Sequence, residues 1–297
     1  MEATKLSNSK TLFAAGSLLE ILSAEVTRFL EKEPSNRMGE AWGGERMWEQ
    51  TLLGSARGDD PIFDVFKEAI EPLHWTPADA FAAGGFTAGA EELAAVSWVL
   101  PHSAVTKKDN ALQKDMPSER WARSRSYGEE VNVKLRAHLV EFLKDAGIDA
   151  VAPMNLPGWT RLDSERYGYA SNWSERHIAY ACGLGTFGLS QGLITPLGKA
   201  VRFGSIVLRG QVNPPPRPYV KHDEYCPFKA DKTCGACIRR CPAGAISENG
   251  IAKLICSDYT HDKVIPHVEE HYGFTGYGCG LCQTGVPCTS GIPGRAS

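Results

Sequence analysis

Eight of the nine cysteines in this 297-residue chain lie in one stretch near its C-terminal end. In order, they are Cys226, Cys234, Cys237, Cys241, Cys256, Cys279, Cys282 and Cys288. The stretch contains two Cys-x2-Cys pairs, and a proline follows Cys241 directly. Cysteines at such short spacings indicate a metal site more often than ordinary packing. The fold therefore has to bring these thiols together, whereas the ninth cysteine, Cys182, is expected to be a small buried residue.

The spacing resembles the ligand pattern of two [4Fe–4S] clusters. In bacterial ferredoxins the cysteine that precedes the proline ligates the other cluster of the pair. This rule assigns a first cluster to Cys226, Cys234, Cys237 and Cys288, and a second cluster to Cys241, Cys256, Cys279 and Cys282. Seven residues separate Cys226 from the next cysteine, where the ferredoxin pattern has two, so Cys226 is the ligand that most needs testing.

Two structural zinc sites are the alternative, because paired Cys-x2-Cys motifs also form zinc sites with four cysteine ligands. The Cys-x3-Cys-Pro spacing, followed by Ala-Gly-Ala-Ile over 243–246, favours iron–sulfur clusters instead. Two clusters so close in the sequence are expected to lie within electron-transfer distance of each other. The C-terminal part would then conduct electrons to a site within the first two hundred residues.

The composition is that of a globular protein in a reducing compartment. Hydrophobic residues make up 42% of the chain and charged residues 23%, which is typical of soluble domains. A net charge of −3 without a long basic run argues against a nucleic-acid partner. No apolar stretch is long enough to span a membrane, and residues 1–10 lack the plan of a secretory signal. We therefore expect a cytoplasmic protein, in which cysteines bind metals or clusters rather than form disulfides.

The organisation of the chain predicts two domains. A proline-rich stretch over 213–218 precedes the cysteines and suits a linker, so the predicted domains are 1–212 and 213–297. The first domain is expected to be α/β or α+β. Hydrophobic periodicity predicts helices over 12–30, 127–145 and 174–182, and strands over 95–100, 148–153 and 202–208.

One segment before the cysteines resembles a known family. The run over 173–188 reads WSERHIAYACGLGTFG, and it is followed by GLITPLG over 192–198 and VRFG over 201–204. These motifs are similar to those of cobalamin-dependent iron–sulfur reductases, which include epoxyqueuosine reductases and reductive dehalogenases. The resemblance covers roughly 95–288. It implies a nitroreductase-like, cobalamin-binding core followed by a ferredoxin-like domain with two [4Fe–4S] clusters.

The resemblance also implies site residues. A corrinoid in the base-off form would receive a low-potential electron from a cluster and reduce an organic substrate. Glycines in this segment would leave room for the flat ligand. The implied cofactor-binding residues are Gly183, Leu184, Gly185, Thr186, Gly188, Ile194, Thr195, Pro196 and Gly198. The candidates for proton transfer and substrate binding are Tyr169, Asn172, Arg176 and His177.

Two other interpretations of the glycines have to be weighed. Gly183-Leu184-Gly185 could be an ordinary helix C-cap and turn. A Rossmann dinucleotide site fits less well, because these glycines follow a predicted helix rather than a strand. The cluster cysteines and the segment over 193–198 favour the corrinoid interpretation.

The chain also departs from the family pattern. Epoxyqueuosine reductases have an acidic residue in an Asp-Ser-Ala-Pro segment, whereas the stretch over 169–174 here has no carboxylate. The sequence ends nine residues after Cys288, without the helical-repeat extension of many of those enzymes, and it lacks the export signal and long N-terminal region of respiratory dehalogenases. We therefore expect a small organic substrate rather than tRNA, and a low-potential donor such as ferredoxin or flavodoxin. The alternatives are an electron-transfer or reactivating protein for a separate corrinoid protein, and a flavin enzyme on this scaffold.

Overall fold

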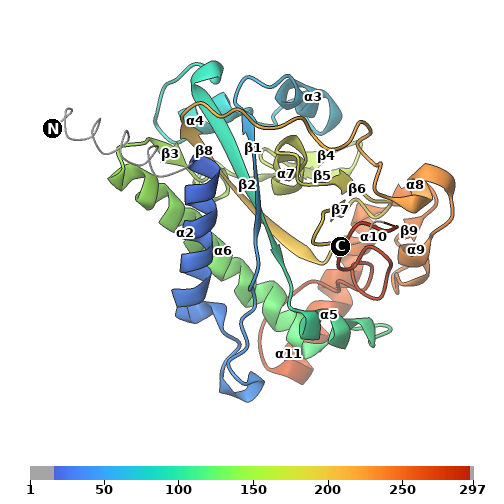
Figure 1. The fold of residues 1–297 in the computed structure, drawn as a ribbon. Coiled ribbons are helices and arrows are strands. Elements are labelled where there is room, and N and C mark those ends of the chain that lie inside the picture. Colours follow the sequence, from blue (N-terminus) through green and yellow to red (C-terminus); the bar gives the residue numbers. More distant parts are fainter. Residues whose placement is uncertain (1–16, 295–297) are drawn as a thin grey trace.

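The computed structural model describes residues 17–294, which form a mixed α/β fold around a four-stranded sheet (Figure 1). The strand order is β1 (Leu52–Arg57), β2 (Leu93–Pro101), β8 (Val201–Arg209) and β3 (Ala150–Val151). All three pairings in this sheet are antiparallel, so the arrangement is α+β. The central strand β2 is buried along its whole length, which explains its continuous apolar sequence.

Helices cover both faces of the sheet. Successive side chains of a strand point to opposite faces. Accordingly, Val96 and Trp98 of β2 pack in one core with helices α2 (Leu18–Lys32) and α6 (Glu119–Asp145). Ala95 and Val99 face the other core, with helices α3 (Ile62–Ala69), α4 (Pro77–Ala83) and α7 (Glu175–Ala181). The sheet is thus the middle of three layers.

The three predicted helices are confirmed with shifted ends. Helix α2 begins at Leu18, where Ser17 forms a capping box with Glu20, and the predicted residues 12–16 lie outside the described part of the chain. Helix α6 begins eight residues before the predicted start at 127, because the Ser118 hydroxyl accepts a hydrogen bond from the Trp121 N–H and caps the helix. Helix α7 matches the prediction to within one residue at each end.

The predicted strands are also present, with one correction. Strands β2 and β8 each extend beyond the predicted range. The third prediction, over 148–153, was too long, because only Ala150–Val151 pair with β8. The chain then turns into the 3-10 helix η4 (Pro153–Asn155), whose first residue is a proline that cannot donate to a sheet.

Short elements fill the rest of the fold. Before residue 213 they are η1 (Pro34–Asn36), η2 (Glu40–Trp42), η3 (Ala90–Glu92), α5 (Ala104–Ala111), β4 (Arg161–Ser164), β5 (Gly168–Ser171), β6 (Thr186–Phe187) and β7 (Leu193–Ile194). After it they are α8 (Pro227–Asp231), α9 (Ala236–Arg239), β9 (Ile246–Ser247), β10 (Gly250–Ile251), α10 (Lys253–Tyr259), the π-helical turn η5 (Thr260–Val264) and α11 (Ile265–Tyr272). No helix within 17–294 is long and apolar enough to cross a membrane.

The cysteine-containing part lies to one side of the sheet, orange to red in Figure 1. The proline-rich stretch that leads to it has no regular secondary structure. It is nevertheless attached to the first part of the chain, because Arg217 donates to the Ala181 carbonyl oxygen at 2.9 Å and pairs with Asp60. The domain boundary at 212/213 stays a prediction.

Candidate functional site

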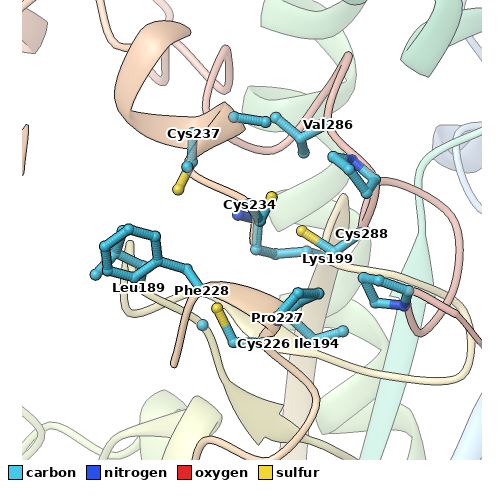
Figure 2. A pocket seen from close by; sticks show the side chains of 15 residues that line it. Leu189, Ile194, Lys199, Cys226, Pro227, Phe228, Cys234, Cys237, Val286 and Cys288 are labelled. Atoms are coloured by element: carbon cyan, nitrogen blue, oxygen red, sulfur yellow. The ribbon is translucent and has the colours of Figure 1, made fainter. Parts of the chain in front are cut away.

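Four of the eight cysteines surround one cavity. Cys226, Cys234, Cys237 and Cys288 all line it (Figure 2). They come from separate places: Cys226 precedes α8, Cys237 lies on α9, and Cys288 belongs to the C-terminal loop. The structure thus brings together the four cysteines predicted for the first cluster, including Cys226 with its long gap.

Close backbone contacts hold Cys288 at this cavity. The Lys199 N–H donates to the Cys288 carbonyl oxygen at 2.8 Å, and the Ala200 N–H donates to the Thr289 carbonyl oxygen at 3.2 Å. Gly198 has φ +88°, and a Cβ there would lie 2.2 Å from the Thr289 carbonyl oxygen. A glycine is therefore required where the turn after β7 meets the C-terminal loop.

The other four cysteines also lie near one another. Burial raises the pKa of Cys279 to about 12, and the neighbouring thiols of Cys282, Cys256 and Cys241 add to the effect. Burial likewise raises the pKa of Cys282, on which Cys256 and Cys241 act in the same direction. The four cysteines predicted for the second cluster are therefore close enough to raise one another's pKa values.

The loop with Cys279 and Cys282 is held by helices α5 and α6. The Trp121 indole N–H donates to the Gly278 carbonyl oxygen at 3.1 Å, and the Asn110 amide donates to the Thr284 hydroxyl at 3.0 Å. Arg240, next to Cys241, donates to the Gln113 carbonyl oxygen at 2.8 Å. The residues that position these cysteines therefore come from far earlier in the chain.

A cubane cluster suits a ring of thiols around a cavity, since its irons and sulfides occupy the space between the ligands. Within residues 17–294, no group of three or more His, Cys, Asp or Glu side chains converges closely enough to hold a single metal ion. Four cysteine side chains, from Cys226, Cys234, Cys237 and Cys288, line the one cavity, which is the number of thiolates that a cubane cluster takes. The role of the cysteines as ligands stays a prediction.

Lys199 is a buried cation at the same cavity, and the sequence analysis missed it. Its side chain is 3% exposed, and its ammonium donates to the Ser190 hydroxyl at 3.1 Å. Burial alone would lower the pKa of Lys199, but the nearby thiolates of Cys288, Cys282 and Cys237 hold it above the usual value. A buried ammonium beside cysteines suits an anionic group in the cavity.

The glycine segment packs against the protein itself. A Cβ on Gly185 would lie 2.2 Å from the Ile194 carbonyl oxygen, and one on Gly188 would lie 3.3 Å from the Ile194 Cδ1 atom. Gly183 follows α7 with φ +80°, as in a helix C-cap, and has open space beside Pro218. The requirement for glycine at 185 therefore follows from packing between β6 and β7, and the predicted corrinoid contacts remain untested.

Two threonines of this segment are also engaged internally. The Thr186 hydroxyl accepts from the Tyr225 N–H at 2.8 Å, directly before Cys226. The Thr195 hydroxyl donates to the Gly198 carbonyl oxygen at 2.8 Å and shapes the turn that contacts the Cys288 loop. The segment thus connects the sheet to the cysteine cavity at two places.

We expect Gly185→Ala to destabilise the protein by roughly 1–3 kcal/mol, because the added methyl group meets backbone that cannot rotate away. Gly188→Ala is the matched control, since its nearest neighbour is the end of a flexible side chain. The midpoint of thermal unfolding measures both. Equal effects from the two variants would show that the contact with Ile194 does not explain the glycine.

A group of cationic and aromatic side chains lies beside the second set of cysteines. The Lys253 ammonium donates to the Tyr169 carbonyl oxygen at 3.0 Å and lies 4.9 Å from the ring centre of Tyr167. Arg176 is exposed and donates to the Gln191 carbonyl oxygen at 3.0 Å. Burial raises the pKa of Cys256, and the charge of Arg176 opposes this effect, so Arg176 lies close to that thiol. Tyr169, Arg176 and Lys253 could bind an anionic ligand here.

Lys253 was missed by the sequence analysis. It begins α10, one helical turn before Cys256, and this spacing of three residues was the available signal. Positions three apart on a helix share a face, so a lysine there is directed to the same side as the cysteine.

The other predicted catalytic residues mainly hold the structure together. The Asn172 amide accepts from the Thr160 N–H at 2.9 Å and donates to the Gly158 carbonyl oxygen at 2.8 Å. His177 is hydrogen-bonded to the Ser174 hydroxyl at 2.8 Å. Burial, with the nearby charge of Arg176 among the smaller effects, lowers the pKa of His177 well below its usual value. The role of His177 in proton transfer stays a prediction.

A second buried histidine predicts a pH-dependent stability. His74 is fully buried and accepts from the Ser174 N–H at 3.2 Å. Burial lowers its pKa from 6.5 to about 4, so the folded state binds fewer protons than the unfolded state between these values. This part of the stability is complete above pH 6.5 and is lost as the pH falls toward 4. The free energy of unfolding should drop by about 1.4 kcal/mol between pH 7.5 and 5.5.

Chemical denaturation of the wild-type protein and of His74→Gln across this pH range measures the effect. Glutamine does not titrate, so the variant should lose that part of the slope, whereas the contributions of other groups cancel in the comparison. Identical slopes would mean that His74 is protonated equally in the folded and unfolded states.

Cys182 is separate from the eight clustered cysteines. It is 6% exposed, belongs to the core between the sheet and α7, and its thiol faces the Ala95 carbonyl oxygen. Burial raises its pKa, so the thiol is neutral. It packs as the small buried residue that the sequence predicted.

No protein-family model matches the chain, and no curated protein matches it. Among solved structures, an epoxyqueuosine reductase matches 94% of this chain and 68% of its own, with 14% identity and a TM-score of 0.46. The enzyme from Bacillus subtilis matches 93% and 67%, with 15% identity and a TM-score of 0.44.

A catabolic reductive dehalogenase in complex with 3-bromo-4-hydroxybenzoic acid also matches. The match covers 93% of this chain with 14% identity and a TM-score of 0.48, and the chain spans 37% of that protein.

Proposed function

We propose that this protein is an iron–sulfur oxidoreductase that carries electrons through two [4Fe–4S] clusters to a buried site. The observation that supports this function best is the cavity lined by Cys226, Cys234, Cys237 and Cys288, with the buried cation Lys199 at its wall. Four thiols around an enclosed space suit a cubane, and the ammonium suits its negative charge. The remaining four cysteines would hold the second cluster.

The group that receives the electrons is proposed to be cobalamin in the base-off form, on the strength of the motifs over 173–204. Cobalamin supplies a redox-active cobalt centre when bound. Internal packing requires glycine at 185 and 198, whereas Gly183 has open space beside Pro218. The residues of this chain that suit an anionic part of the cofactor or substrate are Arg176 and Lys253, next to Tyr169.

The proposed substrate is a small organic molecule rather than tRNA. The net charge of −3 gives no broad basic surface for a nucleic acid. The two cations Arg176 and Lys253 offer a local site of the size of a small anion. The proposed electron donor is a low-potential ferredoxin or flavodoxin in the cytoplasm.

A second candidate function is an electron-transfer or reactivating protein that serves a separate corrinoid protein. The packing of Gly185 against Ile194 favours it, because this glycine then needs no cofactor to explain it. The two functions share the clusters and differ in whether the chain itself retains a corrinoid.

Anaerobic reconstitution with iron, sulfide and hydroxocobalamin distinguishes them. The expected result is about eight iron and eight sulfide per chain, and a corrinoid absorption band that stays with the protein through gel filtration. Clusters without a retained corrinoid would favour the carrier. If neither clusters nor corrinoid are retained by protein whose circular dichroism spectrum shows that it is folded, the proposed function is wrong.

The cationic site has its own matched test. Arg176→Met should weaken retention of the corrinoid or substrate and leave the iron content unchanged, because Arg176 is not among the cysteine-holding residues. Arg28→Met removes an exposed arginine on α2 and serves as the control. Equal retention by both variants would exclude Arg176 from the site.

A further inference from the structure

Lys199 occupies an unusual position between the two sets of cysteines. Its side chain lines the cavity with Cys226, Cys234, Cys237 and Cys288 (Figure 2). Its ammonium is buried at this cavity, where Cys288 helps to hold the pKa of Lys199 above its usual value. It also interacts electrostatically with Cys282 of the second set.

Contacts along its whole length hold the Lys199 side chain in the interior of the protein. Gly192 lies against the aliphatic part of Lys199, since a Cβ at 192 would be 2.8 Å from the lysine Cδ atom. The Ser190 hydroxyl accepts one ammonium hydrogen at 3.1 Å. The lysine N–H is bonded to the Cys288 carbonyl oxygen at 2.8 Å, so backbone and side chain both contact the same cysteine.

No carboxylate within residues 17–294 forms an ion pair with Lys199. Burying an ammonium without a negative partner costs several kcal/mol. The groups that face it are thiols and one serine hydroxyl. A negatively charged cluster bound by these cysteines would offset the unfavourable burial of the Lys199 ammonium.

We propose that Lys199 sets the reduction potential of the cluster held by Cys226, Cys234, Cys237 and Cys288, because its buried ammonium charge lies at the cavity that these cysteines line. The proposal rests on the proposed function, because it requires that the clusters are present. Reduction adds one electron from the external donor to the cluster and forms or breaks no bond. A nearby cation and N–H donor stabilise the more negative reduced state and so raise the potential.

This position gives Lys199 a role in the direction of electron flow. Lys199 lines the cavity with Cys226, Cys234, Cys237 and Cys288, so it would raise the potential of a cluster held there more than that of a cluster held by the other four cysteines. Lys199 would thus act on the reduction potential through its charge and is not a catalytic residue.

The test is a redox titration of the reconstituted protein, followed by electron paramagnetic resonance, with iron and sulfide measured in parallel. Lys199→Met keeps the length of the side chain and removes the charge and the donors. Reduction of one of the two clusters should become at least tenfold less favourable, which is about 59 mV for a one-electron couple. The control is Lys229→Met, which replaces an exposed lysine on α8, three residues after Cys226. It should change the reduction equilibrium of each cluster by no more than a few-fold.

Each outcome bears on the proposal. Two clusters with unshifted potentials in Lys199→Met would overturn it. If that variant loses four irons, Lys199→Gln decides, because glutamine retains an N–H donor without the charge. A glutamine variant with both clusters and a smaller shift in the same direction supports the proposal, and one with wild-type potentials overturns it. Absence of iron and sulfide from the wild-type protein would instead be a failure of the proposed function.

Discussion

Cys226→Ala is expected to lower the iron and acid-labile sulfide of the reconstituted protein from about eight to about four per chain. Cys226 lies 7% exposed at the cavity that it shares with Cys234, Cys237 and Cys288. A cubane with four irons needs a ligand for each of them, and no other cysteine within residues 17–294 lines this cavity. Alanine is preferred to serine in this variant, because a serine oxygen can replace a thiolate.

Cys182→Ala is the matched control. Its thiol is equally buried but lies in the core between the sheet and α7, away from the cavity. We expect this variant to keep about eight irons and to differ only slightly in stability. A Cys226→Ala protein that still holds about eight irons would show that the first cluster takes its fourth ligand elsewhere.

Arg136→Met is expected to have the largest effect on stability. Arg136 is 1% exposed on α6, and its guanidinium contacts Glu129 at 3.0 Å and Glu175 at 3.2 Å. Glu175 also accepts from the Ser205 hydroxyl of β8. Removing the arginine leaves the Glu175 carboxylate buried without its cationic partner, which costs roughly 3–5 kcal/mol, whereas Glu129 keeps its ion pair with Arg202. The midpoint of thermal unfolding should fall by roughly 5–8 °C.

Two further variants make this prediction specific. Lys134 lies on α6, like Arg136, and forms an exposed ion pair with Glu33 at the end of α2. Lys134→Met should lower the free energy of unfolding by about 1 kcal/mol or less. Arg136→Met combined with Glu175→Gln should recover part of the loss, because the uncompensated charge is also removed. If Arg136→Met is no more destabilising than Lys134→Met, the buried pair contributes little.

The ion pair between Arg136 and Glu175 changes the interpretation of Glu175 and its neighbour Arg176. In the sequence they are neighbours within the motif over 173–188, and both are candidates for a site. In the structure Glu175 points into the protein toward Arg136, whereas Arg176 is exposed and contacts Gln191. Adjacent helical residues lie about 100° apart around the axis, so only one of them can face the core. Which one does so depends on how α7 packs on the sheet.

Several features follow from local sequence alone. The helices over 18–32 and 175–181 are set by apolar periodicity, and Ser17 caps the first of them. The long apolar run over 93–101 becomes the central strand because helices cover both of its faces. The start of α6 was missed, because the capping serine at 118 lies nine residues before the expected boundary.

Residue spacing alone predicts how the eight cysteines are grouped, because in the ferredoxin pattern the cysteine before the proline ligates the other cluster. The cavity then brings together Cys226 and Cys288, the first and last cysteines of the stretch, in agreement with that grouping. Only the tertiary structure decided that Gly185 is required by Ile194, and that Lys199 lies buried against Cys288. The physical reason is that close packing and electrostatics depend on distance in space, which residue spacing along the chain specifies only within a single turn or helix.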